Sequence, residues 1–350
     1  MTRKNAALAD LESGRFGGYK IAVLVPCYNE EKSVGKVVDD FRAALPTAAI
    51  LVYDNNSTDN TARVARAAGA EVLHEARQGK GFVVRRMFAD VDADIYVMVD
   101  GDATYDAPSV RRMIGRLLEK QLDMVVGARV DRDAGAYRAG HRAGNKVLTG
   151  FVARMFDSKL NDMLSGYRVL SRRFVKSFPV LSGGFEIETE LTVHALVLGL
   201  AVEEVDTPYY ARPHGSLSKL NTWRDGLRIL RTIGNLYRAE HPLPFFTGIG
   251  LVLALISVGL AIPIVTTFLE TGLVPRLPTA VLSTGLMLLA FLSAAVGLIL
   301  DTVTRGRREL KLLAYLSHDL PAAESVAAQT RGSAPKNKVP SGQKAARKRS

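Results

Sequence analysis

The chain has 350 residues, of which 47% are apolar, and it carries a formal net charge of +11. This length admits one α/β domain of ordinary size together with additional segments. The single cysteine, Cys27, excludes an intrachain disulfide framework and a cysteine-based metal site, so we predict that it packs in the core of a domain in a reducing compartment.

The first part of the chain reads as a leader followed by an α/β domain over residues 19–220. Residues 1–18 mix acidic and basic side chains without an apolar segment, which predicts a disordered leader and not a signal peptide. Amphipathic helices are predicted over Glu31–Leu45 and Pro108–Lys120. They alternate with short apolar runs that predict buried strands, namely Ile21–Val25, Ala49–Tyr53, Ile95–Val99 and Met124–Val126. Such alternation is typical of a mainly parallel, Rossmann-like sheet covered on both faces.

A basic amphipathic segment follows at residues 221–243. Apolar side chains recur there at helical spacing, and arginines lie between them. Two interpretations fit this pattern. The segment is either a helix lying in a membrane interface or a helix packed on the preceding domain.

Two uncharged runs come next, at residues 245–269 and 277–300. At 1.5 Å per residue each spans roughly 36 Å as a helix, more than the about 30 Å of a hydrocarbon core. We therefore predict two transmembrane helices joined in a hairpin by Glu270–Arg276. The link carries one arginine and the flanks carry several, so the positive-inside rule places the large domain and both termini in the cytoplasm. We therefore predict a multi-pass protein of the inner cell membrane.

Residues 301–350 form a basic tail in this prediction. Between Arg331 and Ser350 there are seven Lys or Arg residues and no acid. This composition is typical of a solvated, disordered end and is also compatible with attraction to anionic lipid headgroups. Glycines in the hairpin, namely Gly248, Gly250, Gly259 and Gly285, leave a homo-oligomer possible through close helix packing.

Acidic residues follow the third predicted strand in the pattern Asp100-Gly101-Asp102. Ligands of open α/β sheets bind beyond the carboxyl ends of the strands, so both carboxylates should face one ligand. Carboxylate oxygens suit Mg²⁺ or Mn²⁺, which usually also bind substrate phosphates. The alternative for such a short motif is a turn or a helix cap.

Polar motifs also follow the first two predicted strands. Val25–Glu30 follows one strand and Asp54–Asp59 follows the next. In a functional interpretation Glu30 and Asp54 accept hydrogen bonds from a base or a ribose, and in a structural one the motifs are turns that end in helix caps. Because three polar motifs follow three successive strands, we predict that they line a single cleft.

Together with two later motifs, these segments resemble family 2 glycosyltransferases, and more narrowly polyprenyl-phosphate glycosyltransferases of the dolichol-phosphate mannose synthase type. The resemblance covers about residues 20–300. It rests on Pro26–Glu30, Asp54–Thr61, Asp100–Asp102, Asp162–Arg168 and Gly215–Leu220.

The resemblance implies a GT-A fold, a UDP- or GDP-sugar donor, a Mg²⁺ or Mn²⁺ ion, and inverting transfer to a polyprenyl phosphate. It implies that Asp102 is the main metal ligand with Asp100 beside it. The nucleotide-sugar would be held by Pro26, Tyr28, Glu30, Asp54, Asp100 and Lys219. The lipid phosphate would be held by Arg129 and Arg142. The catalytic group would comprise Asp162, Asp102 and Arg168.

Several roles stay open at this point. Asp162 is a base, a stabiliser of positive charge on the sugar, or a partner in a salt bridge to Arg168. Glu186 and Glu188 share one face if their segment is extended, and either binds sugar or a cation or caps the next helix. The sequence also departs from the family at Asn55, where a second Asp is frequent, and at Thr104, where Gln is frequent. Arg77–Gly81 lacks the spacing of a P-loop, so we interpret it as a turn near the nucleotide and assign no role to Lys80.

Three other functions compete with this interpretation. One is a membrane-bound glycosyltransferase with a saccharide or protein acceptor, and another is an inactive membrane scaffold, which the intact acidic pair argues against. A transporter is disfavoured because two helices without internal charge line little pore. We expect the lipid bilayer, the donor and the acceptor as partners, and no nucleic acid.

Overall fold

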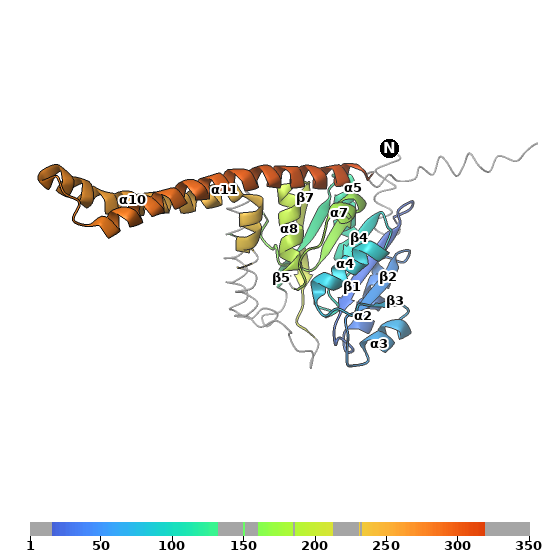
Figure 1. The fold of residues 1–350 in the computed structure, drawn as a ribbon. Coiled ribbons are helices and arrows are strands. Elements are labelled where there is room, and N and C mark those ends of the chain that lie inside the picture. The colour runs from blue at the N-terminus through green and yellow to red at the C-terminus, as the bar shows by residue number, and fades with distance from the viewer. Residues whose placement is uncertain are drawn as a thin grey trace, which may run out of the picture.

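The computed structural model describes residues 16–131, 150, 160–184, 186–212, 231 and 233–318. An α/β domain carries a long two-helix arm that projects away from it (Figure 1). Residues 1–15 of the predicted leader, Arg142, Lys219 and the tail beyond residue 318 lie outside the described residues, whereas Phe16, which was predicted to belong to the leader, is buried in the core of the domain.

The domain is built on a seven-stranded sheet with the order β3-β2-β1-β4-β6-β5-β7. Its strands are β1 Ile21–Cys27, β2 Ala49–Asp54, β3 Glu71–His74, β4 Ile95–Met98, β5 Met124–Asp131, β6 Arg168–Ser171 and β7 Val202–Tyr209. Strand β6 pairs antiparallel with both β4 and β5, and the other pairings are parallel. The predicted mainly parallel sheet is therefore confirmed, and all four predicted strands are present.

Helices cover both faces of this sheet, and this explains why its central strands β1 and β4 are apolar throughout. In β1, Val23 and Val25 pack on one face and Ala22 and Leu24 on the other. The first face is covered by α2 Val34–Ala44, α3 Thr61–Ala67 and α5 Ser109–Glu119. The second is covered by α4 Lys80–Asp90, α7 Arg172–Ser177 and α8 Ile187–Val197. A strand buried on two sides needs apolar residues at every position, not only at alternate ones.

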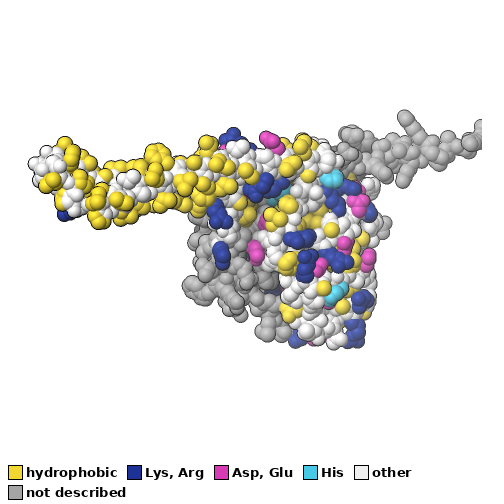
Figure 2. Space-filling model, in the orientation of Figure 1, with side chains coloured by type: hydrophobic (Ala, Val, Ile, Leu, Met, Phe, Trp, Pro, Cys, Tyr) yellow, Lys and Arg dark blue, Asp and Glu magenta, His cyan; other side chains and the backbone are white. Residues whose placement is uncertain are grey.

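The arm consists of α10 Pro242–Thr271 and α11 Leu277–Leu316, both long and apolar enough to cross a membrane. Only 11% of the most apolar 18-residue window of each helix is buried within the chain. In Figure 2 the arm is covered largely by apolar side chains, whereas charged side chains gather on the domain. Such a surface is incompatible with a water-exposed helix pair and indicates membrane association.

Polar and small residues hold the two long helices together. Ser257 Oγ donates to Ser283 O at 2.7 Å, and Ser283 Oγ donates back to Ser257 O at 2.9 Å. At Gly250 a Cβ atom would lie 2.8 Å from Ala290 O, so only glycine permits this approach. The other three glycines singled out in the hairpin have open space around them.

Helix α11 does not end with the uncharged run at residue 300. It continues to Leu316 and packs on α7 of the domain. Residues 233–240, ahead of α10, are also helical, and Ile233 is fully buried against Met163 and Val193. This part of the predicted amphipathic segment thus packs on the domain, which is one of its two predicted placements, while residues 213–230 lie outside the described residues.

Candidate active site

The polar segments after β1, β2 and β4 meet at one edge of the sheet, as their parallel pairing requires. Cys27 lies opposite Asp54 in the register of β1 and β2, and Asn55 N donates to Cys27 O at 2.9 Å. Strand β4 lies on the other side of β1 and delivers Asp100 to the same edge. A Cβ on Gly101 would overlap Cys27 Sγ, so the buried cysteine packs beneath the acidic turn as predicted.

Asp54 is buried and has one carboxylate oxygen without a hydrogen-bond partner in the described structure, Oδ1. Its other oxygen lies 3.7 Å from His74 Nδ1. A buried acceptor without a donor is costly, and a ligand that donates a hydrogen bond would relieve that cost. Glu30, also buried, accepts from Ser33 Oγ at 3.0 Å, and Tyr28 lies nearby in sequence with 37% of its surface exposed.

Asn55 fixes the loop between β3 and α4 through hydrogen bonds to four of its residues, of which Gln78 donates to Asn55 Oδ1 at 3.4 Å. Its Nδ2 donates to Glu75 O at 2.9 Å and to Arg77 O at 2.7 Å, and its Oδ1 accepts from Gly79 N at 2.7 Å. An aspartate has no N–H and could not donate to the two carbonyls. The departure from the family pattern at this position therefore has a structural reason, which is that the side chain must both donate and accept.

Lys80, at the start of α4, lies at the centre of the site, where it pairs with Asp100 at 2.5 Å and also with Glu188 of α8. A Cβ on either neighbouring glycine, Gly79 or Gly81, would overlap the backbone of residues 182–183, so both glycines let α4 approach that loop. Burial alone would lower the pKa of Lys80, but the two carboxylates outweigh it and raise the pKa above its usual value.

Asp102 is buried and bound on both of its oxygens. Arg212, just after β7, contacts Oδ2 at 2.6 Å. Thr104 donates to Oδ1 through its hydroxyl at 2.6 Å and its backbone N–H at 3.2 Å. Burial and the neighbouring Asp100 charge raise the pKa of Asp102 above its usual value. The turn thus concentrates negative charge, and Lys80 and Arg212 balance it.

Asp162 and Arg129 form a bidentate pair. Arg129 Nε donates to Asp162 Oδ2 and its Nη2 donates to Oδ1, each at 2.7 Å, and Arg129 N donates to Oδ2 at 3.1 Å. The Arg129 guanidinium also lies over the Tyr209 ring, 5.6 Å from its centroid. The structure therefore joins the predicted catalytic aspartate to a predicted phosphate ligand, and the predicted salt bridge of Asp162 to Arg168 is not formed.

Arg168 is fully buried and donates to the backbone carbonyls of Ser165, Met163 and Glu188 at 3.0, 2.6 and 3.0 Å. Burial lowers its pKa to about 10. A side chain so engaged positions the residue 162–168 loop and the start of α8. In the same loop, a Cβ on Gly166 would overlap the Asp100 carboxylate, so this glycine brings the loop onto the acidic turn.

Several predicted site residues are thus brought together, namely Glu30, Asp54, Asp100, Asp102, Asp162 and Arg129. Lys80, Glu188 and Arg212 were not assigned to the site from the sequence, and the segment of Glu188 is helical, not extended. The two glycines around Lys80 were the available signal, since they mark a close backbone approach. Within the described residues no group of three or more His, Cys, Asp or Glu side chains is arranged to hold a metal ion.

Comparison with known proteins identifies relatives over most of the chain. Residues 22–178 match the family model described as glycosyl transferase family 2. An uncharacterized protein of Shigella flexneri is 56% identical over 155 residues, which are 44% of this chain and 95% of the relative. Glycosyltransferase AglJ of Haloferax volcanii is 35% identical over 244 residues, 69% of this chain and 80% of AglJ. A dolichyl-phosphate hexose transferase of the same organism is 26% identical over 213 residues, 61% of this chain and 92% of the relative.

Among solved structures, glucosyl-3-phosphoglycerate synthase of Mycobacterium tuberculosis has a similar fold. The TM-score is 0.54 at 24% identity, over 65% of this chain and 84% of that chain. A structure of that synthase with Mn²⁺, UDP-glucose and phosphoglyceric acid gives the same TM-score at 23% identity, over 68% and 84% of the two chains. The likeness confirms the predicted GT-A-like architecture.

Proposed function

Because this chain belongs to glycosyl transferase family 2 and is a glycosyltransferase, we propose that it transfers a sugar from a UDP- or GDP-sugar to a polyprenyl phosphate. The transfer would invert the anomeric carbon and take place at the cytoplasmic face of a membrane. The proposal rests on one observation. The same chain has a buried acidic turn, Asp100–Asp102, and an arm long enough to span a membrane. A relative named for a dolichyl-phosphate acceptor supports the lipid substrate.

The nucleoside part of the donor would bind at the ends of β1 and β2. The free Oδ1 of Asp54 is a ready acceptor for an N–H of a base or a ribose hydroxyl. Glu30, Tyr28 and Pro26 would complete this pocket, and the loop held by Asn55 would close its side. These assignments place the diphosphate of the donor towards the acidic turn.

The acidic turn fits a divalent metal ion in its chemistry. Asp102 and Asp100 would hold the ion, Mg²⁺ or Mn²⁺, and the donor phosphates and water would supply its other ligands. The ion would neutralise the charge that grows on the nucleoside diphosphate as it leaves. In the present structure the positive charges of Lys80 and Arg212 balance the two carboxylates. This supports the proposal that the acidic turn binds a cation.

The acceptor would bind beside Arg129 and Asp162. A phosphate monoester is already an anion near neutral pH and needs little deprotonation, so holding it against a second anion is the main task. The planar fork of Arg129 suits phosphate oxygens, and Asp162 keeps that fork oriented. Asp162 would in addition stabilise positive charge on the sugar ring, while Arg168 holds the loop that carries it. From the family resemblance alone, we also assign Arg142 to the lipid phosphate and Lys219 to the diphosphate of the donor.

The test is transfer of radiolabelled sugar by the purified full-length protein from a panel of UDP- and GDP-sugars to undecaprenyl phosphate, with Mg²⁺ or Mn²⁺ present. Asp102→Asn should lower the rate by about a thousandfold, because it weakens a metal contact worth several kcal/mol. Asp40→Asn, which alters an exposed carboxylate paired with Lys36 on α2, should leave the rate unchanged. Transfer to a saccharide or protein but not to the lipid would refute the proposed acceptor, and full activity of Asp102→Asn would refute the proposed site.

A further inference from the structure

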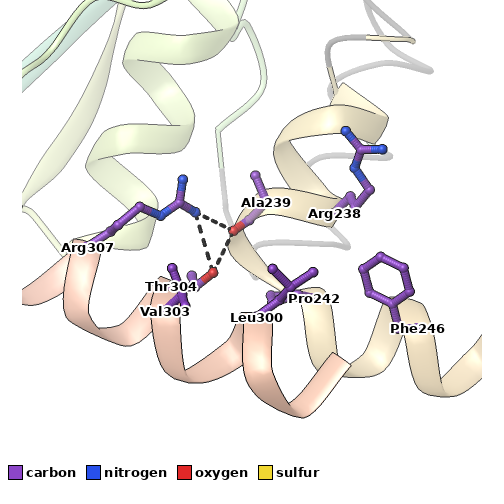
Figure 3. A pocket seen from close by; sticks show the side chains of 8 residues that line it. All are labelled: Arg238, Ala239, Pro242, Phe246, Leu300, Val303, Thr304 and Arg307. Carbon is purple, nitrogen blue, oxygen red and sulfur yellow. Dashed lines mark hydrogen bonds between the residues drawn. The ribbon is translucent and has the colours of Figure 1, made fainter. Parts of the chain in front are cut away.

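A cavity of about 400 Å³ lies at the base of the arm, where α10 begins and α11 passes it (Figure 3). It is formed by the helical turn before α10, the first turn of α10 and the stretch of α11 around residue 304. None of the described residues that line it belongs to the sheet or to the acidic turn. The cavity is therefore separate from the candidate active site.

One wall of the cavity is apolar and continues the surface of the arm. Phe246 comes from α10, and Leu300 and Val303 come from α11. Leu298 and Ile299, in the turn before, are at least 60% exposed, so the apolar surface runs on without interruption towards the tip. Leu300 is also the last residue of the uncharged run, and this places the cavity at the depth where hydrocarbon gives way to headgroups.

Two exposed arginines lie at the rim of the cavity, Arg307 on α11 at one end and Arg238, on the helical turn before α10, at the other (Figure 3). Arg307 Nη2 donates to Ala239 O at 2.8 Å, which fixes this side chain at the rim, and Thr304 Oγ1 donates to the same oxygen at 3.0 Å. Within the described residues neither arginine has a carboxylate within ion-pair distance.

The other cations on this stretch of α11 each have a carboxylate partner. Arg305 pairs with Asp301 at 2.9 Å, and Arg308 and Lys311 share Glu240, each at 3.2 Å. Arg238 and Arg307 differ from them in having no acidic partner among the described residues. An apolar wall below two unneutralised guanidinium groups matches a molecule with a hydrocarbon tail and a phosphate head.

We propose that this cavity is a binding site for an anionic phospholipid, with the phosphate between Arg238 and Arg307 and an acyl chain along Phe246, Leu300 and Val303. A phospholipid of the bilayer is favoured over the polyprenyl phosphate because no group of the acidic turn reaches the cavity, so a phosphate bound here cannot accept the sugar. The bound lipid fixes the depth at which α11 leaves the membrane. The inference rests on insertion of the arm in a bilayer and not on the sugar transfer.

The experiment measures the lipids that stay bound to the full-length protein in native mass spectra, after release from vesicles of phosphatidylcholine and phosphatidylglycerol. The wild type should retain phosphatidylglycerol in preference to phosphatidylcholine. Arg238→Gln together with Arg307→Gln should lower the retained phosphatidylglycerol by about thirtyfold, as expected for two contacts to a membrane anion. Arg305→Gln removes one positive charge two residues before Arg307, from a side chain that is paired with Asp301, and should retain phosphatidylglycerol as the wild type does.

Two controls separate loss of lipid binding from unfolding of the variants. Arg238→Gln alone removes no hydrogen bond of the described structure, so its loss of lipid cannot come from unfolding, and circular dichroism checks the helix content of the double variant. Equal loss in Arg305→Gln would overturn the proposal in favour of diffuse surface charge, and equal retention of phosphatidylcholine would overturn it as well. Displacement of phosphatidylglycerol by equimolar undecaprenyl phosphate would reassign the cavity to the acceptor.

Discussion

At the scale of single residues, the site is a set of charges that only tertiary folding brings together. Asp100 and Asp102 were predictable, because an apolar run ends at them and strand ends bind ligands. Their partners Lys80 and Arg212 lie in other segments, and no local pattern reports such a pairing. The ion pairs of Lys80 should contribute more to stability than a surface pair does. Lys80 has only 9% of its side chain exposed, whereas Lys36, in a surface pair, has 64%.

We predict that Lys80→Met destabilises the domain by about 3–5 kcal/mol, because it leaves Asp100 and Glu188 as uncompensated, largely buried charges. Thermal unfolding of the full-length protein in detergent measures the effect. Lys36→Met removes a surface ion pair and should cost less than about 1 kcal/mol.

A second variant separates charge from shape at this position. Lys80→Met combined with Glu188→Gln removes one of the two stranded carboxylates and should recover part of the lost stability. If Lys80→Met unfolds at the temperature of the wild type, the buried ion pairs do not stabilise this part of the fold.

At the scale of elements, the strands and the uncharged runs were predictable, and the ends of the long helices were not. Absence of charge marks the part of a helix that lies in hydrocarbon, but a helix continues wherever its residues favour it. Residues 301–316 are rich in Leu, Arg, Lys and Glu, which are good helix formers, so α11 extends beyond the run. The role of this extension depends on Tyr315, whose partners on the domain lie far away in sequence.

Tyr315 joins α11 to the start of β5. Its hydroxyl donates to Asp123 Oδ2 at 3.0 Å, and the Arg173 guanidinium lies 4.7 Å from its ring centroid. Arg173 and Ser171 also contact Asp123 Oδ1, at 2.6 and 3.0 Å. One buried carboxylate thus anchors the end of the arm to the domain.

We predict that Tyr315→Phe weakens this anchor by about 1 kcal/mol, which is less than is usual for a hydrogen bond to a charged group because Asp123 keeps its other partners. Amides of residues 311–316 should then exchange with deuterium about fivefold faster, while those of β1 are unchanged. Leu313→Ala alters a 63% exposed side chain on the same helix and should have no such effect. Unaltered exchange in Tyr315→Phe would mean that the apolar contact of the ring with the domain suffices.

At the scale of the whole molecule, the arm and the domain form one continuous structure (Figure 1). The part of α11 beyond residue 300 extends about 24 Å at 1.5 Å per residue before it ends against α7. If the arm spans a membrane as we propose, this continuous helix sets the height and tilt of the candidate active site over that membrane, which a flexible linker would leave free. The orientation that we propose across the bilayer rests on charge, since the flanks of the arm hold Arg305, Arg307, Arg308 and Lys311 and its tip holds Arg276.

The orientation predicts which positions a membrane-impermeant maleimide reaches in intact cells. The natural cysteine, Cys27, is 2% exposed and gives little background. Val274→Cys, in the link between α10 and α11, should be labelled from outside because it is exposed and lies on the far side of the membrane. Lys36→Cys, on the exposed surface of α2, should be labelled only after the cells are permeabilised. Labelling of Lys36→Cys in intact cells, with Val274→Cys protected, would mean that the orientation is the reverse of the proposed one. The sugar transfer would then take place outside the cytoplasm and would need a separate supply of nucleotide-sugar donors there.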